Sequence, residues 1–170
     1  MKKSQLRQII REEINKLSPK LNDNFWRWFG NSKVVDSKGN PLVVYRTQKK
    51  QYSHSSGITL PPYKNKEDSA VFGIYFSENP NSTKIYGDTT ESYFVKMENP
   101  LILRGFEYDE PWIYSIVTKD KYLDLKSKGY DGAIWNKDGE MYELVVFNRN
   151  QIKSTNNKGT WDNTDNVYSH

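Results

Sequence analysis

Residues 71–87 combine aromatic and hydroxyl side chains in a way that a hydrophobic core does not require. The segment reads VFGIYFSENPNSTKIYG, in which a strand-like run containing Tyr75 is followed by Thr83 and Tyr86, three residues apart. A core could use the aromatic rings but would gain nothing from the hydroxyl groups. Because residues i and i+3 lie on one face of a helix, Thr83 and Tyr86 are expected to point into one pocket.

A carboxylate that opens an apolar run is the second feature with chemical potential. Glu143 begins the run ELVVF, where a buried charge is costly unless it has a partner. Glu143 is therefore either an exposed residue at a strand end or part of a site. Three segments place polar or aromatic side chains at strand ends that one fold can bring together, namely Tyr45–Thr47, Gly73–Phe76 and Tyr142–Leu144.

Composition restricts the class of protein to which these residues belong. The chain has 170 residues, of which 35% are hydrophobic and 14% aromatic, and this predicts a folded domain whose core is built largely from Trp, Tyr and Phe. It has no cysteine and only His54 and His170 as histidines, so disulfides are excluded and no metal site is expected. No apolar run reaches the length of a membrane span, and we expect a soluble protein without membrane contact.

The basic charge leaves two interpretations open. The net charge is +4 and the pI is about 9.0. Scattered lysines, such as Lys49, Lys50, Lys119 and Lys121, either form an ordinary solvated surface or follow a phosphate backbone.

The elements that must position these residues are mostly short strands. Residues 1–20 predict an amphipathic helix that ends at Ser18-Pro19, which either packs on its own domain or binds a partner. Residues 21–170 predict one α+β domain built on antiparallel sheets. We expect helices at 24–29, 79–86 and 111–128, and strands at 34–35, 42–45, 73–76, 92–97 (continued by 101–103), 131–135 and 142–147. Residues 49–69 predict a long loop, and residues 154–170 a polar surface tail.

Taken in order, these motifs resemble the ADP-ribosyltransferase superfamily, which includes poly(ADP-ribose) polymerases and diphtheria-type toxins. Gly73–Phe76 matches the glycine-isoleucine-tyrosine-phenylalanine strand of that superfamily. Thr83 and Tyr86 fall where its members hold nicotinamide with a Ser and a Tyr, and Glu143 begins an apolar strand as the catalytic glutamate does. Over residues 24–162 the chain is most similar to the ADP-ribosyltransferase domains of phage polyvalent proteins.

The resemblance implies a split antiparallel β-sheet with flanking helices, and NAD as co-substrate without a metal. It implies that Tyr75 and Tyr86 sandwich the nicotinamide ring, while the Thr83 hydroxyl and the Thr47 backbone bind its carboxamide. Glu143 would bond the ribose 2′-hydroxyl and stabilise positive charge on the ribose, as in glycoside hydrolysis.

Two positions depart from the pattern of the polymerase-like members. Those members have a histidine and a glycine where this chain has Arg46 and Thr47. The toxin-like branch has an arginine at the position of Arg46, where it orders the NAD-binding strands and contacts ribose or phosphate. The catalytic set implied is therefore Arg46, Tyr75 and Glu143. Arginine-modifying members also carry a Glu two residues before the catalytic one, where this chain has Met141.

These observations favour a phage-encoded, toxin-like mono-ADP-ribosyltransferase that acts as a monomer. It would modify a protein or nucleic acid of the host, in the cytoplasm of the host bacterium or after delivery within a virion. Two alternatives stay open. The same residues suit an NAD glycohydrolase, in which water replaces the acceptor, and a basic binding module could keep the fold without the chemistry. The RNA 2′-phosphotransferase branch is disfavoured because Arg46 has no matching histidine.

Overall fold

A computed structural model of the chain describes residues 21–49, 73–104, 119–137, 140–157, 159–164 and 167, together with Gln5. The expected N-terminal helix is represented among these residues by Gln5 alone. Most of the expected loop at 49–69, the first part of the expected helix at 111–128 and the turn at 138–139 also lie outside the described residues.

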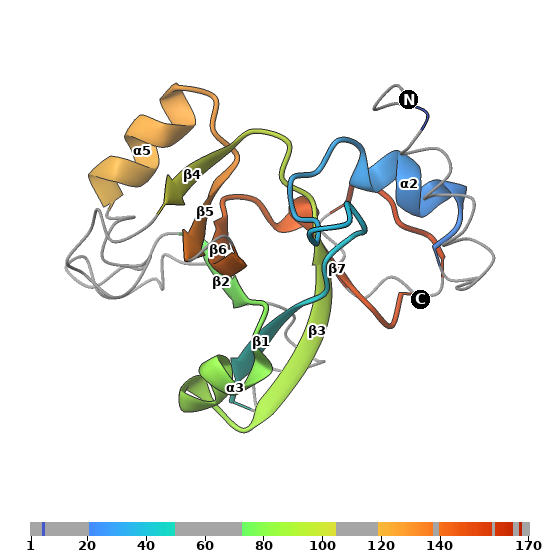
Figure 1. Ribbon diagram of the computed structural model, residues 1–170, viewed down its shortest axis with the longest axis horizontal. Coiled ribbons are helices and arrows are strands. Elements are labelled where there is room, and N and C mark those ends of the chain that lie inside the picture. The colour runs from blue at the N-terminus through green and yellow to red at the C-terminus, as the bar shows by residue number, and fades with distance from the viewer. Residues whose placement is uncertain are drawn as a thin grey trace.

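The described strands form one curled seven-stranded sheet in the order β4-β5-β6-β2-β1-β3-β7 (Figure 1). The strands are β1 (Val44–Gln48), β2 (Ile74–Ser77), β3 (Thr89–Val95), β4 (Pro100–Arg104), β5 (Gly132–Lys137), β6 (Glu140–Val146) and β7 (Ile152–Ser154). Every pair is antiparallel except β4 and β5, which run parallel. The α+β class expected from the sequence is confirmed, with this one parallel pair as an addition.

The prediction that residues 101–103 continue the strand at 92–97 is wrong. These residues belong to β4, which lies at the opposite edge of the sheet from β7, the strand next to β3. The chain turns between the two strands because the Asp131 carboxylate accepts hydrogen bonds from the backbone N–H groups of Glu98 (2.7 Å) and Asn99 (3.2 Å). That contact joins the start of β4 to the start of β5 and sets up their parallel pairing.

The sheet nearly divides between β2 and β1. These two strands share one registered pair, Tyr45 with Ser77, whereas β1 and β3 share five. One part of the sheet therefore contains β4, β5, β6 and β2, and the other contains β1, β3 and β7. This arrangement agrees with the split sheet that the sequence led us to expect.

Short helices with local capping signals flank the strands. Helix α2 (Asp23–Phe29) begins where the Asn22 side chain accepts a hydrogen bond from the Phe25 N–H, as an N-cap residue does. The expected helix at 79–86 forms as α3 (Pro80–Thr83), followed by the 3₁₀ turn η2 (Lys84–Tyr86). Helix α5 (Lys119–Ser127) is followed by Gly129 in a left-handed conformation, and η3 (Arg149–Gln151) precedes β7. No described helix is long and apolar enough to cross a membrane.

Alternation along the strands gives the sheet two differently covered faces. Leu144 and Val146 belong to a core on one face, with Val34 and Met97 packed among them. Val145 lies between them in sequence, so it points to the other face, where it packs with Leu125 of α5. Phe94 likewise lies between two members of the first core, Tyr93 and Val95, and packs instead with α2. Helices α5 and α2 therefore cover the same face at opposite ends of the sheet (Figure 1).

The prediction of a polar surface tail from residue 154 onward is wrong for the described part of that segment. Trp161 is 2% exposed and packs against Phe25 at a ring-centroid distance of 4.9 Å, and Val167 is also buried. The ammonium group of Lys153, itself fully buried, donates to the carboxylate of Asp162 (2.9 Å) and to the carbonyl of Thr164 (3.0 Å). Two isolated apolar residues and the ion pair of the buried Lys153 with Asp162 thus fix a segment whose average composition is polar.

Candidate functional site

The residues with the clearest chemical potential lie between α5 and α2, on the face of the sheet against which these helices pack. Tyr75 is paired with Val145 and Ser77 with Glu143 across β2 and β6, and residues paired in this way share a face. Tyr75 and Glu143 are both half-buried. The site therefore begins with a phenol and a carboxylate on adjacent strands.

Burial and a neighbouring charge act on the protonation of the Tyr75 hydroxyl. Burial, and secondly the negative charge of Glu143, raise the pKa of the Tyr75 hydroxyl well above its ordinary value. The phenol therefore stays protonated at any physiological pH and can serve as a hydrogen-bond donor beside the carboxylate.

A β-bulge lies directly before Glu143. Trp135 is paired with Glu143, yet the next residue, Asn136, is paired with Met141, so Tyr142 is the extra residue of β6. The Tyr142 ring packs edge-on against Trp135 with centroids 5.1 Å apart and planes at 75°. Met141 points instead into the core on the opposite face. The bulge thus gives Tyr142, rather than Met141, a place on the same face as Glu143.

The Ser77 hydroxyl forms a hydrogen bond with the backbone carbonyl of Tyr142, the extra residue of the bulge. This hydroxyl donates to the Tyr142 carbonyl at 2.9 Å and accepts the hydroxyl of Ser82 from α3, also at 2.9 Å. Ser77 therefore links the bulge of β6 to α3. Sequence analysis assigned no role to Ser77 or Tyr142, although one follows the GIYF run and the other precedes Glu143.

Arg46 bridges the split in the sheet. Its guanidinium group donates from Nη1 to the backbone carbonyl of Tyr75 at 3.2 Å. On β1, Arg46 is paired with Glu91 and two residues away from Val44, which belongs to the core on the opposite face from Glu143. Arg46 thus reaches Tyr75 from the other side of the sheet. Its hydrogen bond connects β1 to β2 where the two strands have no registered backbone pair beyond Tyr45.

Three threonine hydroxyls join β1, β3 and α3. The Thr47 hydroxyl lies 2.7 Å from that of Thr83 and 2.7 Å from that of Thr90, and Thr83 also donates to the Pro80 carbonyl at 3.0 Å. Thr47 and Thr83 are both buried. The two residues expected to bind a carboxamide are therefore in direct contact, and Thr90 is an additional partner that the sequence did not indicate.

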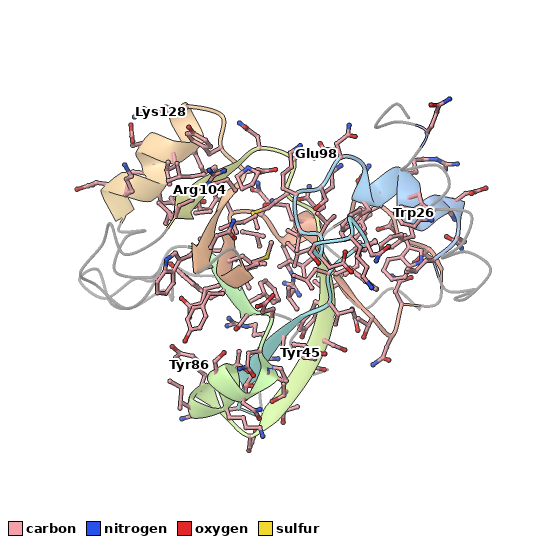
Figure 2. The ribbon with its side chains drawn as sticks, viewed as in Figure 1. Trp26, Tyr45, Tyr86, Glu98, Arg104 and Lys128 are labelled. Carbon is pink, nitrogen blue, oxygen red and sulfur yellow. The ribbon has the colours of Figure 1, made fainter. Side chains whose placement is uncertain are left out.

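Close backbone packing sets the position of Tyr86. A Cβ atom at Gly87 would collide with the backbone carbonyl of Gln48, so glycine lets η2 lie directly against β1. Tyr86 is 51% exposed and its neighbour Ile85 is 73% exposed. In a 3₁₀ turn, residues i and i+3 eclipse one another, which places Tyr86 above Thr83. Figure 2 shows Tyr86 beside α3 at the lower edge of the molecule, with Tyr45 on the adjacent strand.

The structure therefore connects the six residues singled out in the sequence. Glu143 acts electrostatically on Tyr75, the Tyr75 carbonyl accepts from Arg46, and Thr47, which follows Arg46, contacts Thr83. Tyr86 follows Thr83 by three residues. Only Arg46 projects from the opposite side of the sheet.

A hollow of about 400 Å³ lies elsewhere and includes none of these six residues. It is lined by Lys33, Glu78 and Ile134, among others, and Ile134 belongs to the core on the face away from Glu143. Within the described part of the chain, no group of three or more acidic, histidine or cysteine residues is arranged to hold a metal ion.

Comparison with known proteins identifies the family. Residues 36–161 match the model of the family described as ADP-ribosyltransferase in polyvalent proteins (ART-PolyVal). A search of curated proteins found no match. The match covers most of the chain, so the chain belongs to the ART-PolyVal family and carries an ADP-ribosyltransferase domain.

Proposed function

Starting from its membership of the ART-PolyVal family, we propose that this protein uses NAD to transfer a single ADP-ribose unit to a macromolecule of a bacterial host. One observation carries the proposal beyond the family. Glu143 and the protonated Tyr75 lie on adjacent strands and share one face of the sheet. Arg46 links the Tyr75 carbonyl to β1, where Thr47 contacts Thr83.

In the reaction proposed, the bond between ribose C1′ and the nicotinamide nitrogen breaks, and nicotinamide leaves with the bonding electron pair. The positive charge of NAD passes from the ring to the ribose, and the Glu143 carboxylate stabilises it by accepting a hydrogen bond from the 2′-hydroxyl. A nucleophile of the acceptor then bonds to C1′ and releases its proton to water. The balance is NAD and acceptor in, and ADP-ribosylated acceptor, nicotinamide and one proton out.

The other residues bind and orient NAD in this proposal. Tyr75 and Tyr86 supply flat faces for the nicotinamide ring, and stacking of this kind contributes about 1 kcal/mol per aromatic pair. Thr83 and the backbone of Thr47 bind the carboxamide. Arg46 positions β1 against β2 through its hydrogen bond to the Tyr75 carbonyl.

The described residues also bear on the acceptor. Met141 is buried in the core, so the position that carries an acidic residue in arginine-modifying relatives has no carboxylate here. We therefore propose an acceptor other than arginine. Phage origin, action in the bacterial cytoplasm and a monomeric state belong to the same proposal.

The experiment that tests this function uses NAD labelled on the adenylate moiety. Purified protein is incubated with bacterial lysate, and label in macromolecules is compared between the wild type and Glu143→Gln, with intact folding checked by thermal unfolding. Label that depends on Glu143 supports a transferase. If NAD is consumed in a Glu143-dependent way but no macromolecule is labelled, the protein is an NAD glycohydrolase. If no NAD is consumed, the protein is a binding module without catalytic activity.

A further inference from the structure

We propose that Tyr142, presented by the β-bulge beside Glu143, is the residue on which the acceptor stacks, and that the acceptor is a nucleobase of single-stranded nucleic acid. This inference rests on the proposed function and specifies its acceptor. It assigns a role to a residue that regular strand alternation would turn away from Glu143.

The bulge re-aims one side chain. In a regular strand, Tyr142 would point away from the face of Glu143, and Met141 would point with it. The shift between the pairs Trp135–Glu143 and Asn136–Met141 reverses this. Tyr142 packs with the cluster on the Glu143 face, whereas Met141 joins the opposite core. Bulges next to active sites commonly serve to re-aim a side chain in this way.

The surroundings of Tyr142 hold its ring in a fixed orientation. Trp135 is 9% exposed and contacts the Tyr142 ring edge-on. The Tyr142 carbonyl is held by the Ser77 hydroxyl at 2.9 Å, so the backbone is fixed as well. Tyr142 nevertheless remains partly exposed. A partly exposed aromatic ring with a fixed orientation suits a flat partner, because stacking is then gained with little loss of conformational entropy.

The chemistry of this position favours a nucleobase over a guanidinium group. An arginine acceptor would require a carboxylate beside Glu143, and the residue two positions earlier is the buried Met141. The chain carries a net charge of +4, which attracts a polyanion and not a basic peptide. Aromatic stacking platforms on basic proteins are the usual means of binding single-stranded nucleic acid.

The transfer step balances with a base nitrogen as nucleophile. An N–H nitrogen of the base forms the new bond to ribose C1′ as the bond from C1′ to nicotinamide breaks. Nicotinamide leaves with the electron pair, and the proton lost by the base goes to water. No oxidant, reductant or metal is needed.

The test uses the full chain with labelled NAD and three acceptors, namely a mixed-sequence single-stranded DNA, a single-stranded RNA of the same sequence and an arginine-rich peptide. The ratio of acceptor label to nicotinamide released is measured in each reaction, for the wild type, Tyr142→Ala, Tyr142→Phe and Leu123→Ala. Tyr142→Phe keeps the ring, and Leu123→Ala changes an exposed apolar residue on α5. Thermal unfolding is recorded for each variant.

We expect label on a single-stranded nucleic acid and not on the peptide. The ratio should fall about 10- to 100-fold in Tyr142→Ala, which corresponds to the loss of one stacked base. It should stay near the wild-type value in Tyr142→Phe and Leu123→Ala. Nicotinamide release with label on the peptide alone, or an unchanged ratio in folded Tyr142→Ala, would overturn this inference and leave the proposed function standing. Absence of any nicotinamide release would overturn both.

Discussion

The Tyr75 hydroxyl and the Glu143 carboxylate illustrate how a sheet can create a site from two residues that are far apart in sequence. Their strands are adjacent, their side chains share a face, and the carboxylate favours the neutral form of the phenol. The ring of Tyr75 packs against the core cluster beneath α5, so the strand pairing presents a fixed aromatic ring beside a carboxylate.

The raised pKa of Tyr75 predicts how stability depends on alkaline pH. Below about pH 10 the tyrosine is protonated in both the folded and the unfolded chain, so its contribution is fully present. Above that pH only the unfolded chain ionises readily, and the free energy of unfolding should fall by up to about 1.4 kcal/mol per pH unit. Urea unfolding of wild type and Tyr75→Phe, from about pH 9 to about pH 11, should show a steeper fall in the wild type. Parallel profiles would contradict this account.

Tyr86 is predicted to act on NAD and not on the fold. Because its side chain is 51% exposed, Tyr86→Ala should leave the midpoint of thermal unfolding nearly unchanged. The loss of one stacking face should raise the KM for NAD by about 5- to 10-fold. Ile85→Ala is the matched control, since Ile85 is adjacent and even more exposed. Equal effects of the two substitutions on the KM for NAD would show that Tyr86 is not part of the NAD-binding site.

At the scale of elements, the contact of η2 with β1 determines where Tyr86, a residue proposed to bind nicotinamide, lies. In Gly87→Ala, the added Cβ would collide with the Gln48 carbonyl and push η2 away from the sheet. We expect a loss of about 1–3 kcal/mol in stability, as for overpacking elsewhere. We also expect a higher KM for NAD, because Tyr86 moves with η2. Urea unfolding would measure the loss of stability, and steady-state kinetics would measure the KM for NAD. A loss of stability with an unchanged KM would show that the position of η2 does not affect NAD binding.

The C-terminal segment should be acid-sensitive through one ion pair. The hydrogen bonds from Thr164 and Lys153 lower the pKa of Asp162 to about 2. A lowered carboxylate pKa gives stability that is present above the unfolded value of 3.8 and is lost as the pH falls toward about 2. Asp162→Asn leaves the buried Lys153 ammonium without its counter-charge. After allowance for the solvent exposure of Asp162, this should cost about 1 kcal/mol at neutral pH.

Comparison of Asp162→Asn with wild type at neutral pH and near pH 2 checks this prediction. The difference between their free energies of unfolding should shrink as the pH falls, because acid neutralises the carboxylate in the wild type as well. A difference that is constant with pH would show that Asp162 acts only through its hydrogen bonds.

Local patterns predicted some elements and missed others for identifiable reasons. Helix α2 was predictable because its sequence, DNFWRWF, has an apolar face and follows the N-cap residue Asn22. The edge position of β4 was not, because it depends on Asp131, a residue about thirty positions later. The burial of Trp161 was not predictable either, since an isolated aromatic in a polar segment gives no periodic signal. The bulge at Tyr142 depends on cross-strand register, which a single strand does not specify.

At the scale of the whole molecule, the candidate site lies on the strands between two helices. Helix α5 covers β5 and β6, α2 covers β3, and the strands β2 and β1 between them carry Tyr75, Ser77, Tyr45 and Thr47. Helix α3 contacts Ser77 and Thr47, which are both buried. The ordered motifs in the sequence singled out residues on these strands because their intervals resemble those of a known family, and the roles of these residues stay a prediction. They did not predict that Arg46 approaches from the opposite side of the sheet.

The central claim is that Glu143 promotes cleavage of the bond between nicotinamide and ribose. The most direct measurement is nicotinamide release from NAD by the purified full chain, beside Glu143→Gln, with NAD binding measured by calorimetry. The account predicts that Glu143→Gln binds NAD with little change but releases nicotinamide about 10²- to 10³-fold more slowly. Equal rates of release from the two folded proteins, or no release by the wild type, would contradict it.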